Sequence, residues 1–176
     1  MFSVREWSDD AGALRRFGLA LVRDDRFVFD EVAAGALVER LFRQASLTLV
    51  DGPAGDRRAA RVCAFAQFIR LYRRYVRRLA ADEDSGWIEA PSSGRSGRSG
   101  GSAAVAVRGL PLDLREALLL VALAGFTHQE AATALDLPLA IVVERLVHAR
   151  ARLAAHMGAT RPAVAWPLSA HLRIVK

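Results

Sequence analysis

The stretch that most constrains the fold runs from residue 110 to residue 153, where three helices are predicted in close succession. The first is expected to start near Leu112 and to end at Gly125, because glycine commonly follows the end of a helix. The third is expected to begin after Pro138, and the break at 136–139 lies where a helix-turn-helix has its turn. The stretch therefore predicts a helical unit of the helix-turn-helix type.

The second helix of this unit has its own start signal. Thr127 is followed three residues later by Glu130, which is the spacing of a capping box. In that motif the threonine hydroxyl accepts a hydrogen bond from the first turn, and the glutamate accepts one from the backbone of the threonine. Ala131, Ala132 and Leu135 would then face inward, and the two alanines would let another helix cross closely.

The third helix is predicted to have one apolar and one polar face. Its apolar positions recur about three and four residues apart, and we expect them to be buried: Leu139, Val142, Val143, Leu146 and Leu153. The other face combines one acidic residue with an alanine and three basic residues: Glu144, Ala151, Arg145, His148 and Arg152.

Three blocks in this stretch resemble a known family: LPLDLREALLL at 110–120, GFTHQEAA at 125–132 and RLVHARARL at 145–153. Together they are similar to the fourth conserved region of bacterial extracytoplasmic-function sigma factors, which belong to the sigma-70 family. The resemblance implies that the third helix enters the major groove of the upstream promoter element and that the chain binds RNA polymerase core. The alternative is a generic three-helix core without a role in DNA binding.

The resemblance also implies DNA contacts. Arginine can donate two hydrogen bonds to guanine or pair with phosphate, and the basic positions that match the family are Arg145, His148, Arg150 and Arg152. Thr127 and Gln129, at the start of the second helix, would hold phosphate. Typical members carry small polar and basic groups where this chain has Ala140, Ile141, Val143 and Glu144. Base readout is therefore expected to be weaker than in the family.

Three more helices are predicted before the helix-turn-helix stretch. Asp9 or Asp10 can cap a helix that runs to about Val22, and a second helix is expected at about 29–44. The second helix should bury Val32, Leu37 and Leu41, and Gly35 in its middle suggests a close helix crossing. A third is expected from about 57 to 81, with an apolar face that also makes Cys63 a small core residue.

The third of these helices is rich in arginine. Four of its arginines would share one face: Arg70, Arg74, Arg77 and Arg78. This face either is solvated and paired with acids from elsewhere or binds phosphate or an acidic partner, and the sequence favours neither. The residues expected to bind a protein partner are Arg70, Arg73, Arg74, Arg77 and Ile141.

This first half resembles the second conserved region of the same sigma factors at 13–21 and at Asp30-Glu31-Val32. It departs from them at 33–35, within the part that grips the polymerase clamp, and at Arg70 and Arg74, where the family has asparagine and aspartate. The pattern also resembles the sigma-like domain of PhyR-type stress regulators, which bind an anti-sigma protein. A sigma mimic whose two domains close around a helix of an anti-sigma protein is thus the alternative function.

A segment rich in glycine, serine and arginine separates the two halves. The expected organisation is a region 2-like domain at 1–84, a flexible linker at 85–109, a region 4-like domain at 110–157 and a tail at 158–176. The linker would let the halves separate or dock. Trp87 and Ile88 could pin its start to the first domain, and Trp166 and Leu172 make the tail apolar enough to pack.

Composition excludes several classes of function. The chain has 176 residues, 52% of them hydrophobic, and a net charge of +6, which permits a polyanionic partner. A lone cysteine and four scattered histidines give neither a disulfide nor a metal site, and no nucleophile or phosphate-binding glycine loop is evident. We therefore expect a cytoplasmic binding protein with no cofactor, small-molecule substrate or membrane span, and not an enzyme.

Overall fold

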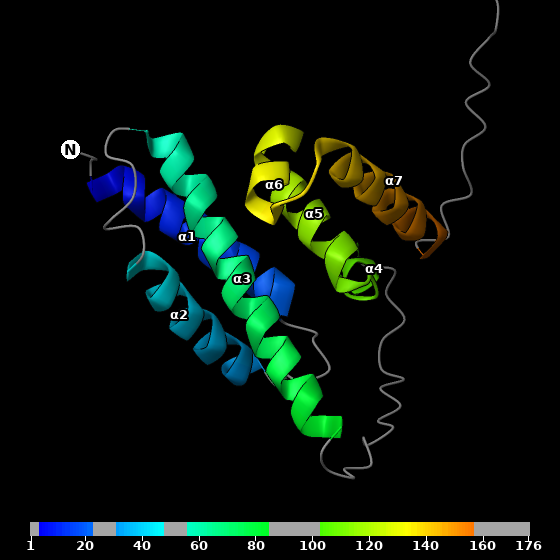
Figure 1. The fold of residues 1–176 in the computed structure, drawn as a ribbon, viewed down its shortest axis with the longest axis horizontal. Coiled ribbons are helices and arrows are strands. Elements are labelled where there is room, and N and C mark those ends of the chain that lie inside the picture. Colours follow the sequence, from blue (N-terminus) through cyan, green and yellow to red (C-terminus); the bar gives the residue numbers. More distant parts are fainter. Residues whose placement is uncertain (1–3, 23–30, 48–55, 85–102, 157–176) are drawn as a thin grey trace, which may run out of the picture.

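A computed structural model describes residues 4–22, 31–47, 56–84 and 103–156. These ranges form seven α-helices and no strand, which confirms the all-α prediction (Figure 1). The helices are α1 (Val4–Val22), α2 (Glu31–Leu47), α3 (Arg57–Asp84), α4 (Ala103–Arg108), α5 (Leu112–Ala122), α6 (His128–Leu135) and α7 (Leu139–His156). No helix in the described ranges is both long and apolar enough to span a membrane.

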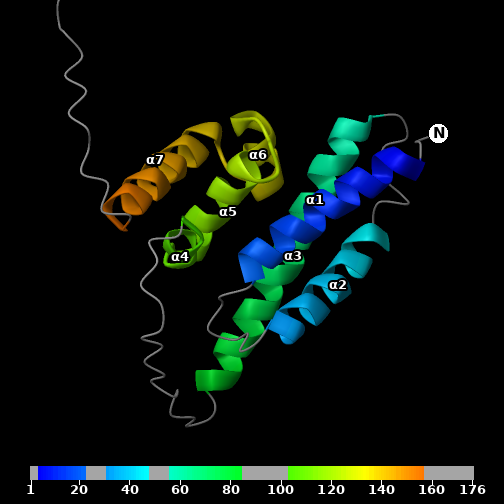
Figure 2. The ribbon, with the colours of Figure 1, turned by 180° about the vertical axis from the view of Figure 1, so that it is seen from behind.

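Helices α1, α2 and α3 pack side by side in both ribbon views (Figures 1 and 2). Their core contains the ring of Phe17, whose centroid lies 5.2 Å from that of Phe65 and 6.2 Å from that of Phe68. Such aromatic pairs stabilise a core beyond the area they bury. A Cβ at Gly18 would come within 2.6 Å of the Phe68 ring, so glycine is needed where α1 crosses α3.

Three expectations for this half are wrong. Val32 is 82% exposed, because the buried face of α2 starts at Ala34 and continues through Leu37 and Leu41. Gly35 meets no atom within 4 Å and so marks no close crossing. Cys63 is exposed, although its neighbours on α3 include core residues. The apolar pattern predicted the positions of the helices correctly, but it did not predict which residues lie on the buried face.

The second half contains the predicted helix-turn-helix. Gly125 has φ +71°, as expected for a glycine beyond a helix end. The capping box is present: the Glu130 N–H donates to the Thr127 hydroxyl at 3.2 Å, and the Thr127 N–H donates to the Glu130 carboxylate at 2.8 Å. Asp136 ends α6 in the left-handed conformation, with φ 57°. Helix α4 lies within the segment expected to be linker, so helical structure begins before Leu110.

The described halves pack against each other, with α3 on α6 and α1 on α5. The rings of Phe65 and Phe126 join the two cores, with centroids 4.8 Å apart. The buried guanidinium of Arg115 donates to the carbonyl of Leu21 at 3.0 Å, across the interface. The linker would let the two halves separate or dock, and in this structure the halves are docked. Most of the segment expected to be linker, with Trp87 and Ile88, and nearly all of the tail lie outside the described residues.

Candidate nucleic-acid interface

Helix α7 lies against the rest of the fold along one side only. Val142, Leu146 and Ala149 are buried, as predicted for the first two of them. Leu139 and Val143 were expected in the core but are 43% and 40% exposed, because the contact with α5 and α6 follows the line through Val142 and Leu146. The opposite side of α7 is open to solvent.

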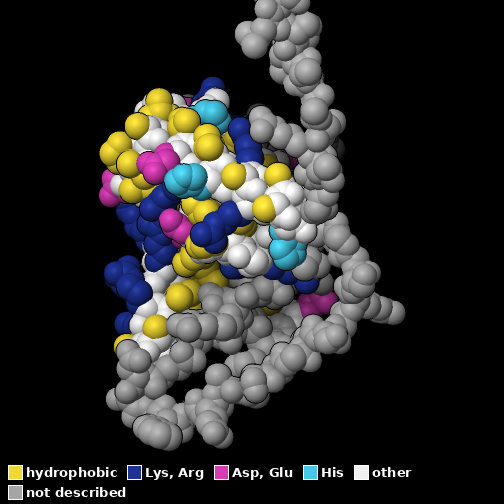
Figure 3. All heavy atoms as spheres, turned by 90° about the vertical axis from the view of Figure 1, so that its right-hand side faces the viewer, with side chains coloured by type: hydrophobic (Ala, Val, Ile, Leu, Met, Phe, Trp, Pro, Cys, Tyr) yellow, Lys and Arg dark blue, Asp and Glu magenta, His cyan; other side chains and the backbone are white. Residues whose placement is uncertain are grey.

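Two arginines stand at the edges of this open side. Arg150 and Arg152 are exposed, and no ion pair joins either of them to another residue of the described ranges. Residues two positions apart on a helix point about 200° apart, so the two guanidinium groups extend toward opposite flanks of α7. His148 is exposed between them. Figure 3, which faces the α7 side of the molecule, shows hydrophobic, acidic, histidine and basic side chains interspersed on this side.

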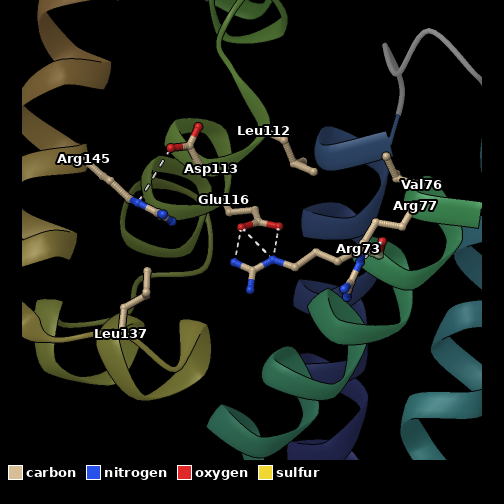
Figure 4. A pocket seen from close by; sticks show the side chains of 8 residues that line it. All are labelled: Arg73, Val76, Arg77, Leu112, Asp113, Glu116, Leu137 and Arg145. Atoms are coloured by element: carbon tan, nitrogen blue, oxygen red, sulfur yellow. Dashed lines mark hydrogen bonds and ion pairs between the residues drawn. The ribbon is translucent and has the colours of Figure 1, made fainter. Parts of the chain in front are cut away.

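Arg145 is placed differently from these two arginines. Its side chain is 23% exposed, and its Nε lies 3.8 Å from Oδ2 of Asp113 on α5 (Figure 4). It points toward the cleft between the halves and not toward the open side of α7. A DNA contact by Arg145 would thus require it to leave Asp113.

Thr127 and Gln129 are exposed at the start of α6. Both the hydroxyl and the N–H of Thr127 already donate to the Glu130 carboxylate, at 2.7 and 2.8 Å. Glu130 also forms an ion pair with Arg58 of α3. The hydrogen bond from Arg58, aided by those from Thr127, lowers the pKa of Glu130 to about 2. A phosphate at Thr127 would therefore have to displace a carboxylate.

A cavity of about 430 Å³ lies between α3 on one side and α5 and the α6–α7 turn on the other (Figure 4). Arg73 and Glu116 meet in it, with the Arg73 Nε 2.9 Å from Oε1. The Glu116 side chain is only 1% exposed, and its burial raises its pKa against the opposing effect of Arg73. Val76, Leu112 and Leu137 supply apolar walls. The cavity thus combines charged groups with an apolar lining at the junction of the two halves.

Most of the arginines at the start of α3 have partners. Arg57 and Arg61 pair with Asp10 of α1 at 3.0 and 3.2 Å, and Arg61 also donates to the carbonyl of Ala124. Further along the helix, four arginines are exposed: Arg70, Arg74, Arg77 and Arg78. Among the residues expected to bind a protein partner, Arg73 is held by Glu116, whereas Ile141 is 38% exposed on α7.

Sequence reasoning missed two charged residues that tie the halves together. Arg115 and Glu116 are both buried, one bonded to backbone carbonyls and the other to Arg73. The sequence signal for them was a pair of adjacent charged residues directly before the apolar run at 117–121. A charge buried beside such a run is costly unless it is paired, so partners were to be expected. Their partners lie 94 and 43 residues away along the chain, which no local pattern reveals.

Comparison with known proteins gives one sequence match and several structural ones. Residues 102–153 match the family described as Sigma-70, region 4. No curated protein matches the chain. A chain in the co-crystal structure of the sigma factor RpoE with the anti-sigma factor NepR, from Bartonella quintana, has a TM-score of 0.67 and 23% identity. That match covers 89% of this chain and 97% of the other.

Two further structures are similar. A chain in the complex of the anti-anti-sigma factor PhyR with NepR, also from Bartonella quintana, has a TM-score of 0.51 and 16% identity, over 86% of this chain and 49% of that one. A chain in the complex of CnrH with the cytosolic domain of CnrY has a TM-score of 0.48 and 24% identity, over 88% and 90%. The resemblance predicted from the three sequence blocks is confirmed: residues 102–153 are similar to sigma-70 region 4, and the chain shares the fold of the sigma factor RpoE.

Proposed function

We propose that this protein is a sigma-type transcription initiation factor that acts in the cytoplasm. Helix α7 enters the major groove of promoter DNA, and the α1–α3 half binds RNA polymerase core. The observation that carries the proposal is the open side of α7, the second helix of a helix-turn-helix, within a segment that matches sigma-70 region 4. In such motifs this helix reads DNA.

The charges on α7 support DNA as the ligand. Arg150, Arg152 and His148 are exposed and free of acidic partners in the described part of the chain. Each arginine that neutralises a phosphate releases condensed counterions, which favours binding. Arg145 would join the interface only after release from Asp113. Thr127 and Gln129 lie at the start of α6, where they would contact the backbone at the edge of the groove.

The exposed part of α3 supports a protein partner on the other half. Arg70, Arg74 and Arg77 remain exposed while the halves are docked, so they are available to an acidic surface of core polymerase. Arg73 is not available in this arrangement, because it neutralises the buried Glu116. Binding that uses Arg73 would have to open the interface between the halves.

A second candidate is a sigma mimic that binds an anti-sigma protein and no promoter. It is favoured by the apolar walls of the cavity and by the exposure of Ile141 on α7, because apolar surface suits an amphipathic helix. The similar RpoE and PhyR chains were both crystallised with the anti-sigma factor NepR. An anti-sigma protein is therefore a proposed partner under either function.

Transcription by core polymerase with the full chain separates the two. An initiation factor yields promoter-dependent transcripts that an anti-sigma protein suppresses. A mimic yields no transcript but binds the anti-sigma protein and thereby restores transcription by a different sigma factor. The double variant Arg150→Ala, Arg152→Ala should reduce transcription in the first case and leave anti-sigma binding intact. Failure to transcribe together with tight anti-sigma binding would overturn the initiation proposal.

A further inference from the structure

The part of α7 farthest from the core has an unusual composition for a DNA-reading helix. We define this outward pole as Ala140, Glu144, Val147, His148 and Ala151, which recur three and four residues apart opposite Val142 and Leu146. All five are exposed, and Val147 is the most exposed large apolar residue of α7, at 57%. The pole contains no arginine.

Glu144 is available for a contact of its own. Its side chain is exposed, and within the described residues no ion pair engages its carboxylate. The adjacent Arg145 turns away to Asp113. A free carboxylate on a surface that approaches DNA is repelled by phosphate, so it is tolerated there only if a hydrogen-bond donor meets it.

The major groove offers groups that match this pole. Thymine presents a methyl group, which apolar side chains such as alanine contact, and cytosine presents an N4 amino donor, which glutamate accepts. Guanine presents only the acceptors N7 and O6, which suit arginine and repel a carboxylate. Residues near the amino end of a recognition helix are those that reach base edges, and Ala140 and Glu144 lie in that part of α7.

On the assumption that the proposed function holds, we propose that the outward pole of α7 selects thymine methyl groups and a cytosine amino group. Val147 and Glu144 are the specificity-determining residues, and Ala140 leaves room for the bases. Arg150 and Arg152, on opposite flanks, then contact phosphates and do not read guanine. The residues at 140–144 that depart from the family pattern thus read different bases, and base readout is not lost.

The first test is selection from random duplexes by the full chain bound to core polymerase. The selected upstream element should be rich in thymine and cytosine on one strand. Replacing one thymine at a time by uracil removes only its methyl group. At the position whose methyl group Val147 contacts, the replacement should weaken binding about threefold to fourfold. Val147→Ser removes the apolar contact and should abolish this sensitivity. Val143→Ser, which makes the same change on the flank of α7, is the matched control and should keep the sensitivity.

The second test uses Glu144→Gln, which keeps the shape but adds a donor. Replacing the selected cytosine should weaken binding of the unaltered protein at least about fivefold and hardly affect the variant. A selected element whose binding is insensitive to uracil substitution and to Glu144→Gln would overturn this inference and leave the proposed function standing. Failure to select any element, in a preparation that binds core polymerase, would overturn both.

Discussion

Two arginines of α3, Arg58 and Arg73, and two of α7, Arg150 and Arg152, have the same chemistry but different surroundings. On α3, Arg58 and Arg73 meet Glu130 of α6 and Glu116 of α5, and these ion pairs join the two halves of the protein. On α7, Arg150 and Arg152 meet no acid in the described ranges. What decides the role of an arginine is therefore whether the fold brings a carboxylate to it, and this depends on contacts between residues far apart in the sequence.

Positive charge alone could not predict which arginines the fold pairs with an acid. One group of α3 arginines is paired with acids from α1, α5 and α6, whereas Arg70 and Arg74 are exposed. That these two bind phosphate or an acidic partner stays a prediction. The acids that meet the paired group, Asp10, Glu116 and Glu130, belong to other helices. Variants of the paired and of the exposed arginines distinguish a structural role from a binding role.

The largest effect is expected from Arg73→Ala, which leaves Glu116 buried without its cation. Removing one partner of a buried pair costs about 3–5 kcal/mol of unfolding free energy. Burial already raises the pKa of Glu116. Above the ordinary carboxyl pKa, the variant must bury a charge or bind a proton, so its stability should fall further as the pH rises.

Urea denaturation at several pH values measures this loss. Arg74→Ala, one position along the same helix and exposed, is the control and should change stability by less than about 0.5 kcal/mol. Equal small losses in both variants would show that Arg73 is not part of a structural ion pair.

The double variant Arg150→Ala, Arg152→Ala should leave the fold intact but weaken promoter binding. Two lost phosphate contacts should make the slope of log affinity against log salt shallower by about 2. The measurement is a salt titration of DNA binding by the complex with core polymerase. Arg150→Lys with Arg152→Lys, which keeps both positive charges, is the matched control and should keep the slope. An unchanged slope in the alanine variant would remove these arginines from the interface.

Thr127→Ala tests whether the start of α6 is structural. Loss of the capping hydroxyl should cost about 1 kcal/mol in a urea denaturation. Thr133→Ala removes an exposed threonine within the same helix, whose hydroxyl only donates to the Gln129 carbonyl, and should be close to neutral. If the Thr127 variant were as stable as this control yet bound DNA more weakly, Thr127 would act mainly on phosphate.

The smallest effect concerns Glu130. Its pKa is lowered to about 2, so the folded state holds this carboxylate charged more readily than the unfolded chain does. The resulting stabilisation is present at neutral pH and is lost as the pH falls from about 4.5 to about 2. Glu130→Gln should remove this part of the acid dependence, measured by thermal unfolding between pH 2 and pH 6. An identical acid dependence in both proteins would contradict the assignment.

Sequence patterns predicted the helices and the cap because these depend on neighbouring residues. The box at Thr127 and the break at Asp136 were identified from spacing alone, and the structure contains both. The patterns failed where burial depends on distant partners: Val32 and Val143 are exposed, and Arg115 is buried. The docking of the halves depends on pairs such as Arg73 with Glu116, 43 residues apart, and could not be derived from periodicity.

Site-directed photo-crosslinking from the open side of α7 tests the central claim most directly. Ala151→Cys, in a chain with Cys63→Ser, places a crosslinker at the outward pole, and the native exposed Cys63 on α3 provides the matched control. In a complex with core polymerase and promoter DNA, we predict that position 151 crosslinks to the upstream element and position 63 does not. Crosslinks from position 151 to protein alone, in a complex that transcribes, would contradict the account.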